Sequence, residues 1–172
     1  MPGINKEIIR RALMVSVLLF VIIFSDQLSK SIIRQKVEYN ERISIIDNFI
    51  TMTKVENTGA FLSLGNHLSK GAYLALMVVA PLLVIAYALY YLVINNTLSG
   101  PVRVGICFIT GGGLGNIIDR ILYGSVTDYL HFNFVIFQTG IVNLADMILT
   151  AGFFILLFTF IFQGKKHKTQ PI

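Results

Sequence analysis

The fold is decided by residues 71–94, GAYLALMVVAPLLVIAYALYYLVI, which contain no charged side chain. A helix of about 20 apolar residues crosses the hydrocarbon core of a bilayer, so this stretch predicts a membrane-spanning helix. Residues 143–162 form a second such stretch, interrupted by one acid, Asp146. The whole chain of 172 residues is 55% hydrophobic and only 13% charged, whereas soluble domains carry about 25% charged residues. The sequence therefore predicts an integral-membrane protein and excludes a disordered chain.

Two shorter apolar stretches complete the predicted spans. Residues 104–118 reach a spanning length from about residue 102, because the charged end of Arg103 can extend to the interface. The stretch 12–24 admits two interpretations, a first helix or the core of a signal peptide, but no small-residue cleavage site follows it. We expect one membrane domain over residues 1–172, with spans at about 8–25, 71–94, 102–119 and 143–162.

The distribution of basic residues predicts the orientation. Four spans place both termini and the 95–103 connection on one side, and the loops 26–70 and 120–142 on the other. Both sides carry the same number of Lys and Arg residues, but the side with the termini is much shorter and has the higher density. The positive-inside rule then predicts cytoplasmic termini. The net charge of +5 is an orientation signal, so we expect no nucleic-acid partner.

The outer loops predict a small β-sheet. Residues 43–56 are rich in β-branched residues and contain Asp47-Asn48, a plausible two-residue hairpin turn. Residues 126–137 alternate between apolar and polar side chains, which is a strand pattern. Residues 58–64 are short and apolar enough to form a surface helix. The predicted fold class is a mainly α membrane protein with four transmembrane helices, a small extracytoplasmic β-sheet and a short surface helix.

The acids cluster on the predicted outer side, with Asp26, Asp119 and Asp146 at the outer ends of three spans. Asp128 follows Asp119 by nine residues, a length of about 30 Å when extended, so it can fold back over these helix ends. An ionisable residue inside an apolar span indicates a functional site. An acid in the first helical turn, complementing the helix dipole, is the other interpretation of Asp146.

Two neighbouring aspartates in a partly dry site can share one proton and act as an acid–base pair. The other acids suit structural roles: Asp26, Lys30 and Arg34 lie at i, i+4 and i+8 on one helix face. For Asp119 we expect an ion pair with the adjacent basic residue or a network with Asn116. A metal site formed by Asp128 and His131 is disfavoured. His131 follows Asp128 by three residues, so on a strand the two side chains point to opposite faces.

Two other features admit simpler interpretations. Cys107, the single cysteine, lies in mid-span and permits no internal disulfide. The glycine-rich run 111–115 is not a phosphate loop, because no Lys-Ser/Thr follows it. Its small residues favour close approach of another helix, either a neighbouring span or a transmembrane substrate.

Taken together, five motif blocks resemble those of the lipoprotein signal peptidase (signal peptidase II) family. In chain order they are Asp26-Gln-Leu-Ser-Lys30, Asn57-Thr-Gly-Ala-Phe61, Gly112-Gly-Leu-Gly-Asn-Ile-Ile-Asp-Arg120, Gly124-Ser-Val-Thr-Asp-Tyr129 and Asn143-Leu-Ala-Asp146. Only Tyr129 departs from the family pattern, where Phe is frequent. The resemblance covers essentially the whole chain.

This resemblance implies an aspartic endopeptidase of the bacterial cytoplasmic membrane, with Asp128 and Asp146 as the catalytic pair. Its substrate would be a prolipoprotein carrying diacylglycerol on a cysteine, cleaved just before that cysteine. The resemblance implies that the enzyme uses no metal or cofactor and that membrane lipid surrounds it. We expect a monomer. Supporting positions carry over to Asp26, Lys30, Asn57, Gly59, Asn116, Asp119, Arg120, Asn143 and Ala145.

The resemblance also implies roles for some of these residues. Asn57 and Arg120 are expected near the substrate backbone or lipid, and Asn116 and Asp119 are expected to orient the catalytic pair. Two other classes stay open from the residues alone. A small transporter would need acids near the bilayer midplane, and a metal-dependent lipid-modifying enzyme would need several acids on one helix face.

Overall fold

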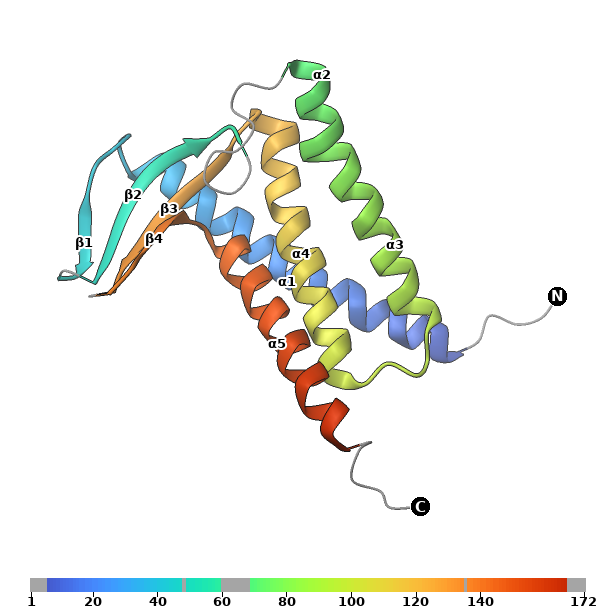
Figure 1. Cartoon of the computed structure of the whole chain (residues 1–172). Helices are drawn as coiled ribbons and strands as arrows, with labels where there is room; N and C mark the ends of the chain where they lie inside the picture. Colours follow the sequence, from blue (N-terminus) through green and yellow to red (C-terminus); the bar gives the residue numbers. More distant parts are fainter. Residues whose placement is uncertain (1–5, 48, 60–68, 135, 167–172) are drawn as a thin grey trace.

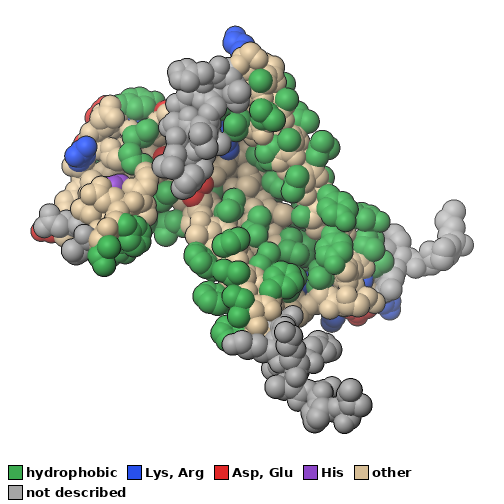
Figure 2. All heavy atoms as spheres, in the orientation of Figure 1, with side chains coloured by type: hydrophobic (Ala, Val, Ile, Leu, Met, Phe, Trp, Pro, Cys, Tyr) green, Lys and Arg blue, Asp and Glu red, His purple; other side chains and the backbone are tan. Residues whose placement is uncertain are grey.

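The structure, a computed structural model, describes residues 6–47, 49–59, 69–134 and 136–166. Four long helical segments dominate it (Figure 1): α1 (Lys6–Lys36), the continuous segment α2 (Lys70–Tyr73), η2 (Leu74–Val79) and α3 (Ala80–Ile94), α4 (Gly100–Tyr123) and α5 (Leu144–Lys166). Within the described residues, four helices are long and apolar enough to cross a membrane. Hydrophobic side chains cover much of the helical face seen in Figure 2. The prediction of four transmembrane helices is confirmed.

The first helix is longer than predicted. We expected the first span to end at residue 25 and Asp26 to close its helix, but α1 continues to Lys36. The helix continues because Lys30 lies on the same face as Asp26 and binds it at 2.8 Å, so the charges that end the apolar stretch compensate each other. The predicted loop 26–70 therefore begins as helix.

The third span also continues beyond its predicted end. Asp119 does not close α4, which runs on to Tyr123 and stops at Gly124. Gly124 has φ of 75°, the left-handed conformation that glycine adopts without a Cβ clash at a helix C-terminus. The fourth span agrees closely with its prediction, since α5 begins at Leu144.

A π-helical turn interrupts the second span at η2, directly before Pro81. There the N–H of Ala80 donates to the carbonyl of Ala75, five residues back. Proline has no N–H to donate, and its ring collides with the carbonyl four residues earlier in a regular helix. The wider turn is therefore the local adjustment that keeps this span continuous.

The two long loops that connect the spans form a four-stranded antiparallel sheet in the order β1-β2-β3-β4. Its strands are β1 (Ile43–Ile46), β2 (Ile50–Asn57), β3 (Val126–Asn133) and β4 (Gln138–Val142). The predicted hairpin at 43–56 and its pairing with the second outer loop are confirmed. Within the sheet, Val55 pairs with Asp128 and Asn57 with Val126.

The strand predicted over 126–137 ends earlier, at Asn133. The backbone groups of Phe134 and Phe137 bind each other at 2.8 and 3.0 Å, closing a tight turn. The chain then returns as β4, which the sequence analysis missed because a five-residue strand with a central Gly140 carries a weak pattern. The predicted surface helix at 58–64 lies almost entirely outside the described residues.

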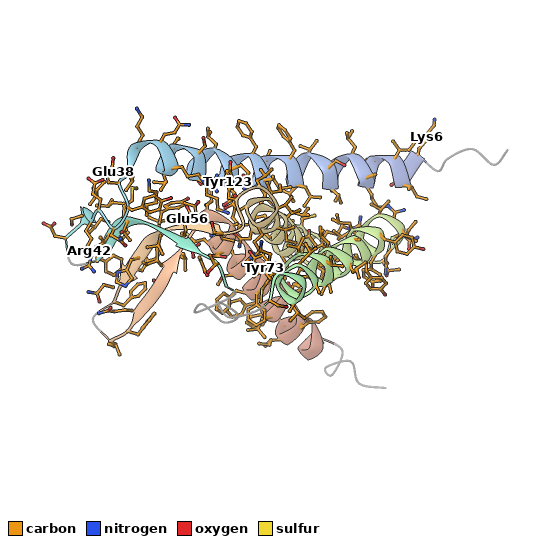
Figure 3. The ribbon with its side chains drawn as sticks, turned by 90° about the horizontal axis from the view of Figure 1, so that it is seen from above. Lys6, Glu38, Arg42, Glu56, Tyr73 and Tyr123 are labelled. Carbon is orange, nitrogen blue, oxygen red and sulfur yellow. The ribbon has the colours of Figure 1, made fainter. Side chains whose placement is uncertain are left out.

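The sheet packs on the C-terminal half of α1, which runs along one side of the molecule from Lys6 toward Glu38 (Figure 3). Ile33, Val37 and Tyr129 form a buried cluster between them. The Tyr129 hydroxyl donates to Ser29 Oγ at 2.8 Å. The extra turns of α1 therefore serve as the platform on which β3, and with it Asp128, is mounted.

Helix α4 packs against α1, α3 and α5. A Cβ on Gly112 would lie 2.5 Å from the carbonyl oxygen of Ala145, and one on Gly115 would lie 2.6 Å from Asp26 Oδ2. Gly111 lies in the same way against Ile22 of α1. The glycines therefore admit neighbouring spans, which decides between the two interpretations of the run 111–115.

Candidate active site

Asp128 and Asp146 are brought to the same asparagine. Asp128 lies on β3 and is 4% exposed, while Asp146 lies half-buried in the first turn of α5. Asn143 Nδ2 donates to Asp128 Oδ1 at 2.6 Å. The Oδ1 of the same amide accepts from the backbone N–H of Asp146 at 2.9 Å. One side chain thus links the two candidate catalytic residues.

Asp146 also belongs to a helix cap. The backbone N–H of Asn143 donates to Asp146 Oδ2 at 3.3 Å, the reverse of the Asn143 bond to the Asp146 N–H. This reciprocal pair is a capping box, which fixes the start of α5. The other carboxylate oxygen, Oδ1, accepts from Asn116 Nδ2 at 2.8 Å. Asp146 therefore lies in the first turn of α5, as the helix-terminus interpretation predicts, and its catalytic role stays a prediction.

Burial sets the protonation of Asp128. Loss of solvent, the larger cause, and the negative charge of Asp146 together raise the pKa of this carboxyl from 3.8 to about 6. Hydrogen bonds from Asn57, at 3.0 Å, and Asn143 stabilise the ionised form and act in the opposite sense. Asp128 therefore holds its proton to a higher pH than an exposed aspartate.

Asn116 connects the pair to a buried cation. Its Oδ1 accepts from Lys30 Nζ at 3.0 Å, and its Nδ2 donates to Asp146. An ammonium group can only donate hydrogen bonds, so Lys30 fixes which end of the Asn116 amide faces it. The N–H₂ end is thereby directed at Asp146, as expected if Asn116 orients the pair.

Behind this amide lies a buried cluster of two acids and two bases. Lys30 binds Asp26 at 2.8 Å and Asp119 at 3.1 Å, and Arg34 binds Asp119 at 2.9 Å. The predicted ladder of Asp26, Lys30 and Arg34 is present, but Asp119 pairs with these α1 bases and not with the adjacent Arg120. Buried charges are tolerated when each one is paired, and here the formal charges balance.

The same cluster holds the elements that carry the two aspartates. Asp26 Oδ1 accepts from the backbone N–H of Ala145, the residue before Asp146, at 3.0 Å. Asp119 Oδ2 accepts from the backbone N–H of Thr127, the residue before Asp128, at 3.4 Å. Each supporting acid therefore positions the chain next to one candidate catalytic residue.

The sequence analysis assigned no role to four residues of this network. Gln27 Nε2 donates to Asp26, to Asp119 and to the Gly115 carbonyl at 3.1–3.2 Å. Glu56 accepts from Ser125 Oγ at 2.6 Å and from Thr127 Oγ1 at 2.8 Å. Their positions could have indicated these roles, because all four are polar residues that lie inside or directly beside the five motif blocks.

Asn57 and Arg120 both bind the backbone of Gly59. Asn57 Oδ1 accepts from the Gly59 N–H at 3.0 Å, and Arg120 Nη2 donates to the Gly59 carbonyl at 3.0 Å. Both backbone polar groups of Gly59 are thus held by side chains. Contact of Asn57 and Arg120 with a substrate stays a prediction.

An apolar groove opens beside Asp146. It has a volume of about 380 Å³ and is lined by Phe132, Thr139, Val142, Asp146, Met147, Thr150, Ala151 and Phe154. Its walls come from β3, β4 and the first turns of α5. Among the described residues, no group of three or more His, Cys, Asp and Glu side chains is arranged to hold a metal ion.

The fold and the site define a multi-pass membrane protein with two linked aspartates at the junction of its sheet and helices. The family model described as "Signal peptidase (SPase) II" matches residues 18–162. The chain belongs to this family and is therefore a membrane peptidase. The predicted resemblance is confirmed, and the transporter and lipid-modifying classes are not favoured.

Curated relatives agree over most of the chain. The lipoprotein signal peptidase of Streptococcus pneumoniae is 36% identical over 148 residues, which is 86% of this chain and 92% of the relative. The lipoprotein signal peptidase of Halothermothrix orenii is 34% identical over 153 residues, which is 89% of this chain and 98% of the relative.

Solved structures confirm the fold. One described as a bacterial membrane enzyme has a TM-score of 0.80 at 23% identity and covers 92% of this chain and 94% of its own. A second structure with the same description has a TM-score of 0.75 at 22% identity, covering 86% of this chain and 92% of its own.

Proposed function

We propose that this protein is an aspartic endopeptidase that removes signal peptides from diacylglyceryl-modified prolipoproteins, cutting just before the lipidated cysteine. The observation that carries the proposal is the bridging of Asp128 and Asp146 by Asn143. Membership of the signal peptidase II family and the names of the curated relatives support the peptide and lipoprotein parts. The protein needs no metal or cofactor and acts as a monomer.

The two aspartates divide the work of hydrolysis. Asp146 accepts hydrogen bonds from Asn116 Nδ2 and from the Asn143 backbone N–H, and we assign it the role of the ionised partner. Ionised Asp146 takes a proton from water, and the resulting oxygen attacks the scissile carbonyl carbon. Asp128, with its raised pKa, is the protonated partner. It donates to the carbonyl oxygen as the negative charge develops there.

Collapse of the tetrahedral intermediate completes the reaction. The carbon–nitrogen bond breaks, and the leaving amine receives a proton from the pair. The new carboxylate belongs to the signal peptide and the new amine to the lipidated cysteine. The pair again holds a single shared proton, because the proton that it took from water replaces the one that it gave to the amine.

The groove beside Asp146 suits the apolar part of such a substrate. Its lining is almost wholly apolar apart from Asp146, Thr139 and Thr150. An apolar chain lying in it passes directly against the candidate catalytic carboxylate. Asn57 donates to Asp128 and, together with Arg120, binds Gly59; in this proposal both residues contact the substrate backbone or lipid.

The membrane orientation is part of the proposal. We place both termini in the cytoplasm and the active site at the extracytoplasmic face of the bacterial cytoplasmic membrane. Supporting this, the sheet and both aspartates lie together at one end of the helices, while the basic residues Arg10, Arg11 and Arg103 lie near the other (Figure 1).

Cleavage of a purified diacylglyceryl prolipoprotein tests the function. The full chain in detergent should release the signal peptide in the presence of EDTA. Asp128→Asn and Asp146→Asn should each lower turnover by at least about a thousandfold, because neither variant can form the proton-sharing pair.

Asp47→Asn is the matched control, because Asp47 is an exposed acid of the β1–β2 turn. It should cleave at the unmodified rate. Loss of cleavage on adding EDTA, or normal turnover in either active-site variant, would refute the aspartic mechanism. Failure of the wild type to cut the lipidated substrate would refute the function itself.

A further inference from the structure

A second polar site lies at the end of the helices opposite the sheet. It is a cavity of about 440 Å³ lined by Glu7, Arg10, Arg11, Met14, Asn96, Gly100 and Arg103. Figure 1 shows the α3–α4 connection beside the start of α1 at this end. Lys and Arg side chains appear there in Figure 2. None of these residues takes part in the proposed hydrolysis.

The decisive residue is Arg11. Its side chain lines the cavity although the residue is only 8% exposed, and its Nη1 is buried without a hydrogen-bond partner. Its Nε donates to the Glu7 carbonyl at 3.2 Å, which fixes the guanidinium. A buried guanidinium N–H without an acceptor is costly. Because Arg11 also lines the cavity, an acceptor brought there by a ligand would stabilise this group.

The surroundings select an anion. Glu7, Arg10, Arg11 and Arg103 together carry a formal charge of +2, and the carboxylate of Glu7 is engaged by Arg10 at 2.9 Å. Arg103 is held by the Leu98 carbonyl at 3.1 Å. Gly100 brings the N-terminus of α4, a 24-residue helix whose dipole favours negative charge, to the wall of the cavity.

The position of the cavity selects a lipid as the source of that anion. It lies at the end of membrane-spanning helices, where phospholipid headgroups lie. Met14, which lines it, is 60% exposed, so the wall continues onto the apolar outer surface of α1. A phosphate here can bind Arg11 while its acyl chains follow that surface.

We propose that this cavity is a binding site for the phosphodiester of an anionic phospholipid, with Arg11 as its central ligand. The guanidinium offers the planar donor pair that matches phosphate oxygens. Zwitterionic headgroups are disfavoured, because the excess positive charge of the cavity would repel their ammonium group. The site is independent of the peptidase activity and is tested without it.

Lipid binding by the full chain in detergent tests the proposal. Dioleoylphosphatidylglycerol and dioleoylphosphatidylcholine are titrated separately, and bound lipid is counted by native mass spectrometry alongside the Tm. We expect the wild type to bind the anionic lipid at least about tenfold more tightly and to gain Tm from it. Arg11→Gln should reduce this preference to less than about twofold.

Arg42→Gln is the matched control, because Arg42 is an exposed arginine near the sheet. It should keep the full preference. If Arg11→Gln does not fold, the wild-type titration still decides, since equal binding of the two lipids overturns the proposal. Equal preference in folded Arg11→Gln and wild type also overturns it. Inorganic phosphate that stabilises the wild type as strongly as the lipid overturns the lipid source.

Discussion

Asn143 is the residue whose side chain connects the two candidate catalytic aspartates. It lies between the sheet and α5, caps that helix, and binds both Asp128 and Asp146. Removing its amide would leave Asp128 with one hydrogen bond fewer and α5 without its cap. At this scale the same contact serves stability and the proposed chemistry.

The raised pKa of Asp128 has a consequence for stability. In the unfolded chain this carboxyl ionises at about 3.8, whereas in the folded protein it does so at about 6. The folded state therefore binds the proton more tightly, so folding stability decreases as the pH rises from 4 to 6. The full difference is worth about 3 kcal/mol above that range.

We expect Asp128→Asn to remove this pH-dependent loss, because an amide does not ionise. The Tm of the variant relative to the wild type should increase between pH 4 and pH 7, measured by thermal unfolding in detergent. Asp47→Asn, at an exposed turn, should show no such trend. Parallel curves for Asp128→Asn and wild type would contradict the raised pKa.

The position of the helices depends on how closely α4 approaches α5. The backbone of Gly112 lies against the carbonyl of Ala145, one residue before Asp146. Asp26 ties the same Ala145 to α1 through its N–H. A small displacement at this crossing therefore moves a candidate catalytic residue.

Gly112→Ala should destabilise the protein by about 1–3 kcal/mol, because the new Cβ would lie 2.5 Å from the Ala145 oxygen. Peptidase turnover should decrease with it. Gly71→Ala is the control, since nothing lies within 4 Å of its Cβ. That change should be neutral or slightly stabilising. A Tm for Gly112→Ala equal to that of the control would show that the crossing is looser than described.

On the scale of the whole molecule, the proposed orientation puts the β1–β2 hairpin on the extracytoplasmic side of the membrane and the α3–α4 connection on the cytoplasmic side. Ser44 and Thr97 are exposed residues of these two segments. Cys107, the native cysteine, is 2% exposed, so single introduced cysteines can be followed against a low background.

In intact cells, or in spheroplasts where an outer membrane is present, Ser44→Cys should react with a membrane-impermeant maleimide. Thr97→Cys should react only after the membrane is permeabilised. The reverse pattern would invert the proposed topology and place the aspartates at the cytoplasmic face. Labelling of the unmodified chain gives the Cys107 background.

The membrane spans were predictable from short stretches of sequence. Transfer of an apolar helix into lipid depends on its own side chains, so the uncharged run 71–94 predicts a span without any partner. The alternation over residues 126–137 likewise predicts a strand from local sequence, and β3 occupies its first part, Val126–Asn133. Asp146 also stood out, as an acid inside an apolar stretch.

Contacts between distant segments could not be read in this way. Lys30, on the extension of α1, is paired with Asp119 as well as with Asp26, and Asp119 lies on another helix. The joining of Asp128 to Asp146 depends on packing β3 against α1 and α4 against α5. Charge compensation and close packing are properties of surfaces in contact, so they arise only when the chain has folded.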